Sequence, residues 1–196
     1  MALTKPRVVV LLQITALCSV LVHDLFGDSI GLSTGETMGI VFVGGYLTAG
    51  GANAVNMWYD RDIDPLMSRT SSRPIPRGDV SPAKALSFGV LLSLAGIIWF
   101  LILSNEVAAF WALFSILFYV FIYSFWLKRS TVQNIVIGGI AGSTPPVIGW
   151  AVAESNLYIN FESISSFLLS LFDLGSSVPW MMFLLIFLWT PPHFWA

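Results

Sequence analysis

The amino-acid sequence predicts an all-α protein, a polytopic bundle of transmembrane helices. Hydrophobic residues make up 56% of the chain, charged residues only 10%, and the mean hydropathy is +0.81. A helix that crosses a bilayer needs about 20 mostly apolar residues. Such stretches lie at residues 8–26, 37–60, 83–103, 107–127, 133–153 and 179–195. None shows the short apolar–polar alternation of a membrane barrel, so we expect six spans in a single transmembrane domain over residues 1–196.

The connection before the last span and the end of the chain each predict something further. The connection is polar and then partly amphipathic at residues 164–174, which indicates an interfacial segment. The last span ends inside an apolar run without a polar flank. We therefore expect the domain to be incomplete at its carboxyl terminus.

The basic residues predict how the spans cross the membrane. With alternating spans, all nine lysines and arginines fall on one side: at the amino terminus, in the loop after the second span, or after the fourth span. Positive charge favours the cytoplasmic side, so the amino terminus and the 60–82 loop are expected there. The start of the chain does not resemble a cleavable signal or an Arg-rich transit peptide, which favours the plasma membrane of a prokaryote.

A polar stripe ends the second span. Its members are Asn53, Asn56, Asp60 and Asp64. Each residue of an α-helix turns by about 100°, so these four are expected on one face and Asp62 on the opposite face. Pro65 is expected to stop the helix just after the last carboxylate. Like charges four residues apart repel, and a bound Mg²⁺, which takes one or two carboxylates plus substrate phosphates, explains their pairing. The alternative is a solvated acidic helix end with Arg61 as counter-charge.

The loop after the stripe carries cations suited to phosphate. Arg69, Arg73 and Arg77 lie within it, and Pro74 and Pro76 keep it from continuing as a helix. Arginine binds phosphate oxygens with a planar two-pronged geometry. A metal site beside arginines and a lipid phase predicts a ligand that is a diphosphate on a long apolar tail. The alternative is that the arginines are only topology signals.

The fourth span is rich in aromatic residues and returns functional groups to the same side. Tyr123 brings a hydroxyl, and Lys128 and Arg129 bring two cations. Aromatic rings inside a bundle can surround a carbocation, because their faces attract cations. Packing or contact with lipid explains them equally well.

Residues 4–7, 56–78, 123–150 and 189–196 together resemble the protoheme IX farnesyltransferases, the haem O synthases of the UbiA-type intramembrane prenyltransferases. The N-x-x-x-D-x-x-x-D stripe is common to that superfamily, whereas segments 60–74, 127–139 and 190–195 are specific to its haem branch. The resemblance covers essentially the whole chain. It implies a helical bundle of about nine bilayer-length spans, with a second aspartate-bearing loop after the sixth span.

The resemblance also implies an activity and a set of site residues. The family joins the farnesyl group of farnesyl diphosphate to a vinyl group of haem B. Asn56, Asp60 and Asp64 are then the catalytic residues and hold Mg²⁺ against the diphosphate. Candidate residues for cradling the phosphates are Arg69, Arg73, Lys128 and Arg129. The partners implied are farnesyl diphosphate, haem B and the lipid bilayer, with haem A synthase or a terminal-oxidase assembly as open alternatives and no nucleic acid.

Three residues are candidates for the haem side of the site: His193, Asn53 and Tyr123. Pro191 and Pro192 remove two helix donors and are expected to bend the last span, which would turn His193 inward. There its imidazole could ligate haem iron or bind a propionate. The alternative is a histidine that anchors the helix at the membrane interface.

Other functions remain open on the residues alone. A prenyltransferase of the same superfamily could act on a quinone precursor or a glycerol lipid, and the chain could be an inactive fragment. An ion-conducting bundle would carry acidic residues near the middle of several spans, whereas here they cluster at one face. A haem-binding structural subunit has only two histidines to use, and they lie near opposite faces.

Overall fold

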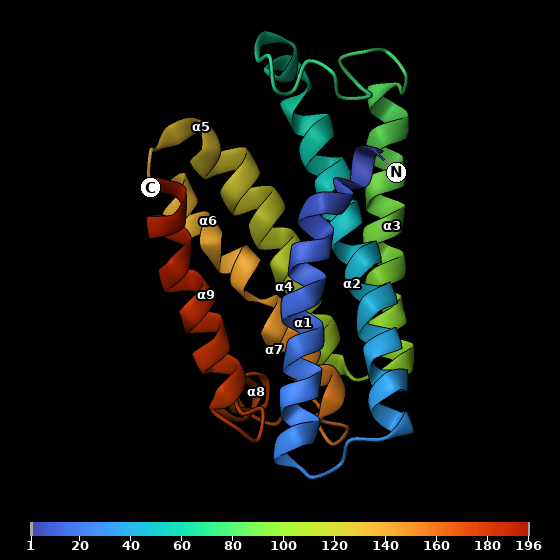
Figure 1. The fold of residues 1–196 in the computed structure, drawn as a ribbon, viewed down its shortest axis with the longest axis vertical. Coiled ribbons are helices and arrows are strands. Elements are labelled where there is room, and N and C mark those ends of the chain that lie inside the picture. The colour runs from blue at the N-terminus through green and yellow to red at the C-terminus, as the bar shows by residue number, and fades with distance from the viewer. Residues whose placement is uncertain (1, 196) are drawn as a thin grey trace.

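The computed structural model describes the backbone of residues 2–195 and the side chains of residues 3–193, and within that range it contains helices and no strand. This confirms the predicted all-α class. The longer helices run up and down the long axis of the molecule (Figure 1). The α-helices are α1 (Pro6–Phe26), α2 (Leu32–Tyr59), α3 (Pro82–Leu103), α4 (Glu106–Leu117), α5 (Lys128–Ser130), α6 (Asn134–Ser143), α7 (Pro145–Ala153), α8 (Ile164–Phe172) and α9 (Val178–Trp195).

Five stretches of the described chain are helical, long and apolar enough to cross a membrane. They are Pro6–Phe26, Leu32–Asp62, Pro82–Leu103, Glu106–Ser130 and Asn134–Ala153. They coincide with the first five predicted spans, so this is an integral membrane protein. The sixth predicted span forms the 18-residue helix α9, which is not among the five. The amphipathic stretch at 164–174 forms α8, close to its expected bounds.

Two predicted spans are not uniform α-helices. The fourth changes at Phe118 from α4 into a π-helix, η4 (Phe118–Leu127), before α5. The fifth is divided at Thr144 into α6 and α7. Pro145 begins α7, where a missing backbone N–H does no harm, but the same proline cannot donate back into α6.

Local sequence explains how α3 and α4 begin. Ser81 caps α3, because its hydroxyl accepts a hydrogen bond from the Lys84 amide, and Pro82 occupies the first turn. Asn105 caps α4 by accepting from the Ala108 amide at 2.9 Å. Its side-chain nitrogen also donates to the Ala151 carbonyl at 2.6 Å, so one residue both starts α4 and holds it against α7.

Small residues let α2 and α3 approach closely. A Cβ added to Gly51 would lie 2.8 Å from the Gly89 carbonyl, and one added to Gly89 would lie 2.9 Å from the Val55 amide. Atoms that close would force the backbones apart, so only glycine fits these contacts. The pairing of α2 with α3 fixes where the end of α2 emerges from the bundle.

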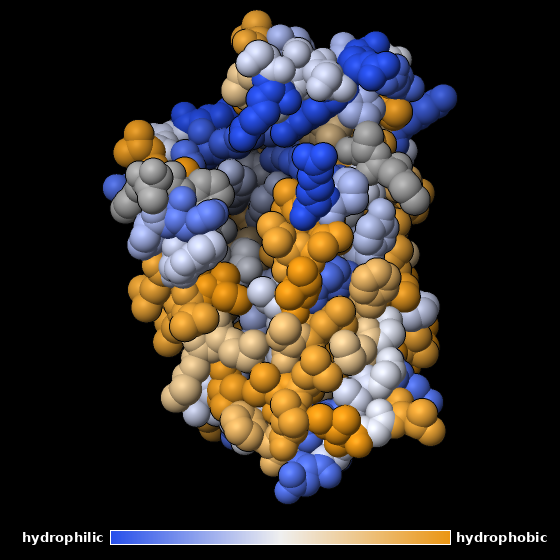
Figure 2. All heavy atoms as spheres, viewed as in Figure 1, coloured by the Kyte–Doolittle hydropathy of each residue, from blue (hydrophilic) through white to orange (hydrophobic). Residues whose placement is uncertain are grey.

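One end of the molecule gathers the polar segments. The amino terminus, the loop from residue 60 to 81 and α5 all lie at this end (Figure 1). In Figure 2 hydrophilic residues form a band across it, and hydrophobic residues cover the middle of the visible face. The predicted placement of the basic segments on a single side therefore agrees with the fold.

Candidate functional site

The polar stripe is not carried by one continuous helix, as the sequence predicted. α2 ends at Tyr59 and is followed by two 3₁₀ turns, η2 (Asp60–Asp62) and η3 (Asp64–Leu66). Pro65 acts one turn earlier than expected, because its ring clashes with the carbonyl four residues before it and disfavours helical geometry at Asp64. α2 therefore ends before the first carboxylate, Asp60, and not after the last.

The three aspartates nevertheless face as predicted. The side chains of Asp60 and Asp64 are 0% exposed, whereas that of Asp62 is 56% exposed. Asn56 and Asn53, about one and two turns further back on α2, are also buried. The stripe thus points into the bundle and Asp62 points out of it.

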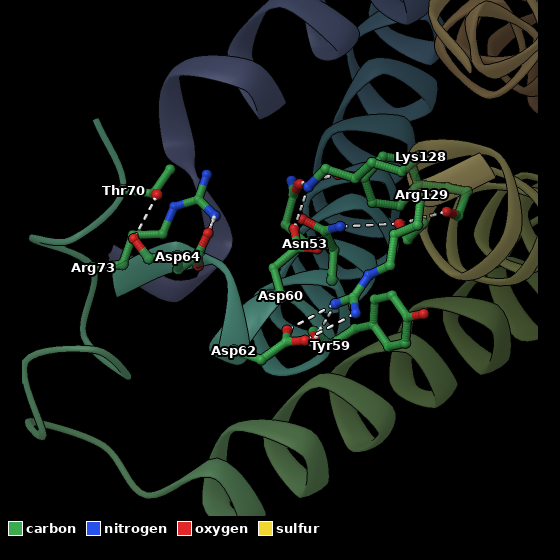
Figure 3. Close-up of polar contacts among 12 residues, drawn as sticks. Asn53, Tyr59, Asp60, Asp62, Asp64, Thr70, Arg73, Lys128 and Arg129 are labelled. Carbon is green, nitrogen blue, oxygen red and sulfur yellow. Dashed lines mark hydrogen bonds and ion pairs between the residues drawn. The ribbon is translucent and has the colours of Figure 1, made fainter. Parts of the chain in front are cut away.

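Each buried carboxylate is paired with a cation from a different segment (Figure 3). Nη1 of Arg73 donates to both oxygens of Asp64, at 2.7 and 2.8 Å. Nζ of Lys128, at the start of α5, donates to Oδ2 of Asp60 at 2.5 Å. Both cations were predicted as phosphate ligands, and the fold brings both to the carboxylate stripe.

One carboxylate oxygen is left over. Oδ1 of Asp60 is buried and has no hydrogen-bond partner among the described residues. An unpaired buried acceptor is costly, and this one lies where a cation or a donor on a ligand would satisfy it. Within the described chain no group of three or more His, Cys, Asp or Glu residues could hold a metal. Two carboxylates and an amide suit Mg²⁺, which completes its shell with water and substrate phosphate.

The amide of Asn56 is held in one orientation. Its nitrogen donates to Oγ of Ser124 at 2.9 Å, and that hydroxyl donates onward to the Tyr119 carbonyl at 2.8 Å. Its oxygen accepts from Nζ of Lys5 at 2.7 Å. The π-helix η4 supplies Ser124, so the break from α-helical geometry in the fourth span contributes directly to the site.

Lys5 is a site residue that the sequence analysis missed. It was counted there as a topology signal and as part of a resembling segment. The pKa of its ammonium group is lowered to about 8, mainly by burial and also by the positive charges of Arg73 and Lys128, against the opposing effect of Asp60 and Asp64. Lys5 therefore lies among the charges of the site. The sequence does show a lysine at position 5, directly before a span, but only the tertiary structure shows where its side chain points.

The other two predicted phosphate ligands lie further out. Arg129 donates to Asp62 at 2.7 and 2.9 Å and to the Tyr59 carbonyl at 3.2 Å. Its guanidinium also lies 4.3 Å from the centre of the Tyr59 ring. These contacts connect α5 to the end of α2 at the solvent-exposed edge of the site (Figure 3). Arg69 is exposed on the same loop as Arg73.

The three candidates for the haem side are dispersed. Asn53 is buried, donates to the Thr4 carbonyl at 3.2 Å and accepts from the Tyr119 hydroxyl at 3.3 Å. Tyr123 stacks on Tyr119 with ring centres 5.4 Å apart. His193 is exposed and stacks on Trp189 at 4.2 Å.

The last span does not turn His193 inward as expected. α9 continues as a helix through Pro191 and Pro192 to Trp195. The side chains of residues 194–196, the end of the resembling segment, lie outside the described residues. Asn53 and Tyr123 both contact Tyr119, whose carbonyl accepts the hydrogen bond from Ser124, so they lie next to the site. His193, by contrast, lies on an exposed face.

Nearly the whole chain is similar to proteins of known family. The model of the UbiA prenyltransferase family matches residues 13–196. A protoheme IX farnesyltransferase of Symbiobacterium thermophilum is 45% identical over 197 residues, which cover 100% of this chain and 57% of that protein. Proteins of the same name from Rhodopseudomonas palustris (45% identical) and Bartonella tribocorum (48%) each align with 100% of this chain and 55% of their own length. The chain thus spans about half the length of these relatives, and no solved structure matches it.

Proposed function

The chain belongs to the UbiA prenyltransferase family, and we propose that it transfers a farnesyl group from farnesyl diphosphate to a vinyl group of haem B, giving haem O. The names of relatives 45–48% identical to it support the haem acceptor. The observation that carries the proposal is the pair of fully buried carboxylates, each matched by a cation, at the polar end of an apolar bundle. This arrangement suits a ligand with a charged head and a long apolar tail.

The paired cations are the groups that would receive the diphosphate. Lys128 and Arg73 form ion pairs with Asp60 and Asp64. Both cations are partly exposed, at 26% and 22%, while the carboxylates are fully buried. They can therefore donate to phosphate oxygens from the exposed side of the pair while the carboxylates stay in place.

The proposed cofactor is Mg²⁺, held by Asn56, Asp60 and Asp64. The orphaned Oδ1 of Asp60 and the fixed amide oxygen of Asn56 support this donor set. When bound, Mg²⁺ neutralises charge on the diphosphate and makes it a better leaving group. Ser124 keeps the Asn56 oxygen directed toward the site throughout.

The reaction breaks the bond between the allylic carbon and the diphosphate oxygen. Lys128 and Arg73 stabilise the negative charge that builds on that oxygen. The rings of Tyr119 and Tyr123 exclude water and present their faces to the allylic cation. The terminal vinyl carbon of haem attacks this cation to form the new carbon–carbon bond. Water then adds to the adjacent carbon and loses a proton, which leaves the hydroxyethylfarnesyl group and free diphosphate.

The acceptor and its surroundings belong to the same proposal. Asn53 and Tyr123, which both contact Tyr119, are the proposed residues on the haem side of the site. The basic end of the bundle faces the cytoplasm, and the organisms of the relatives support a prokaryotic plasma membrane. The product would pass to haem A synthase or to a terminal-oxidase assembly.

The proposal is tested with the chain in lipid nanodiscs. We expect farnesyl diphosphate to bind with Mg²⁺ and to bind much more weakly with EDTA, as measured by calorimetry. With haem B added, mass spectrometry should detect haem O. The same reaction with a hydroxybenzoate or a glycerol lipid as acceptor tests the other prenyltransferase activities. Transfer to one of those acceptors and none to haem would contradict the haem assignment, and no binding of farnesyl diphosphate would contradict the prenyltransferase function.

A further inference from the structure

Lys5 occupies an unusual position for a lysine beside a membrane span. It precedes α1 directly, yet its side chain is partly buried and its Nζ donates to Oδ1 of Asn56 at 2.7 Å. Asn56 lies 51 residues away in the sequence. The chain therefore folds its amino terminus back onto the polar stripe of α2.

The backbone around Lys5 is built to hold it there. Lys5 has φ +49°, in the left-handed region that non-glycine residues rarely adopt. The preceding residue, Thr4, is 3% exposed, and its carbonyl accepts from Nδ2 of Asn53. The methyl group of Thr4 packs against Gly50 of α2, where an added Cβ would lie only 3.1 Å from that methyl group. These contacts, on both sides of one turn of α2, fix the start of the lysine side chain above Asn56.

The charges around Lys5 do not balance without an anion. The groups that act on it are Asp60, Asp64, Arg73 and Lys128. Three cations, Lys5 included, thus share the site with two carboxylates, and a bound Mg²⁺ would increase the positive excess. A diphosphate carries about three negative charges near neutral pH, which is the excess that one Mg²⁺ would create.

We infer that Lys5 is a further diphosphate-binding residue, whose ammonium group binds the Asn56 oxygen in this structure and moves to a phosphate oxygen when the Mg²⁺-diphosphate binds; this inference rests on the proposed function. Asn56 cannot give its oxygen fully to a metal while Lys5 holds it. The flexible stem of lysine and its three rotatable donors suit such an exchange. The site then has three cations that exchange partners: Lys5 from Asn56, Lys128 from Asp60 and Arg73 from Asp64.

A purely structural role for Lys5 would predict a different result. If Lys5 only fastened the amino terminus to α2, its replacement would lower stability and leave the affinity for diphosphate unchanged in the folded protein. The two roles are separated by charge. Arg at this position retains the cation, Gln retains a donor without the charge, and Met retains neither.

The experiment measures binding of farnesyl thiodiphosphate, which resists ionisation, to the full chain in nanodiscs with Mg²⁺. We expect Lys5→Gln and Lys5→Met to weaken binding about tenfold or more, because a charge-assisted hydrogen bond is lost. Lys5→Arg should stay within about threefold of the unsubstituted chain. The matched control is Lys84→Gln, an exposed lysine at the start of α3 on the same side, which should not change affinity.

A second measurement does not depend on any variant folding. Amine-reactive labelling of the unsubstituted chain, followed by mass spectrometry, should show Lys5 protected by farnesyl thiodiphosphate with Mg²⁺ and Lys84 unprotected. Failure of the unsubstituted chain to bind the probe would overturn the proposed function, and this inference with it. Binding without protection of Lys5, or equal affinity in Lys5→Gln and Lys84→Gln, would overturn the role of Lys5 alone.

Discussion

Asp60, Asp62 and Asp64 follow one another closely, yet their surroundings differ. Asp60 and Asp64 are fully buried and paired with Lys128 and Arg73, and one oxygen of Asp60 has no partner among the described residues. Asp62 is exposed and pairs with Arg129 at the rim. By charge alone, the three carboxylates are equivalent. Burial, which sets the strength of every electrostatic contact, separates two of them as ligand candidates.

This difference predicts unequal effects of isosteric substitution. Asp60→Asn and Asp64→Asn should each weaken Mg²⁺-dependent binding of farnesyl diphosphate by about a hundredfold or more, because a buried charged ligand is lost. Asp62→Asn should change binding by less than about fivefold, since an exposed ion pair contributes about 0–1 kcal/mol. Calorimetry on the three variants measures this, with thermal unfolding as the control for folding. Equal losses in all three would contradict the division.

At the scale of the elements, departures from α-helical geometry occur where the site is built. α2 gives way to 3₁₀ turns at Asp60, and the fourth span becomes a π-helix that supplies Ser124. π-helical turns are frequent at functional sites. The contact between α2 and α3, by contrast, is regular and close, and it determines where these irregular segments lie.

Substitution of glycine in α2 tests that contact. Gly51→Ala should destabilise the protein by about 1–3 kcal/mol, because the new Cβ would lie 2.7 Å from the Ser93 amide and 2.8 Å from the Gly89 carbonyl. Gly39→Ala, on the same helix with no atom within 4 Å of its Cβ, should be neutral or stabilising by up to about 1 kcal/mol. Unfolding of both variants in mixed micelles by dodecyl sulfate measures the difference. Equal stability of the two would show that α2 and α3 separate easily.

At the scale of the whole molecule, the fold places the amino terminus, the 60–81 loop and α5 at one end (Figure 1). The long-range pair Lys5–Asn56 joins the amino terminus to the end of α2, and the pair Lys128–Asp60 joins α5 to the start of the loop. The opposite end has no lysine or arginine. Such an asymmetry predicts orientation in the membrane as well as the position of the site.

Cysteine labelling tests the orientation. Single cysteines replace Ser71 and Ser155, which are both exposed and lie on opposite sides of the predicted membrane, in a background in which Cys18 is changed to Ala. Ser71→Cys should react with an impermeant reagent only after the cells are opened, and Ser155→Cys should react in intact cells. Labelling of Ser71→Cys from outside would contradict both the topology and the cytoplasmic site.

Much of the architecture could be predicted from the sequence. Five of the six predicted spans coincide with helical stretches that are long and apolar enough to cross a membrane. The inward facing of Asp60 and Asp64 was also predicted, although the helix that was expected to carry them ends at Tyr59. Spans and faces are predictable because hydropathy and helical periodicity act over a few turns of local chain.

Only the tertiary structure decided which charges meet. Lys128 and Asp60 are 68 residues apart, and Lys5 and Asn56 are 51 apart. No periodic pattern connects such positions, because their meeting depends on how α1, α2 and η4 pack and on where each helix ends. By itself the sequence determined a helical membrane bundle with its polar stripe and its cations at one end. Packing then determined that each of three ligand candidates is held by a particular cation, since a buried carboxylate or amide oxygen must find a partner wherever the fold brings one.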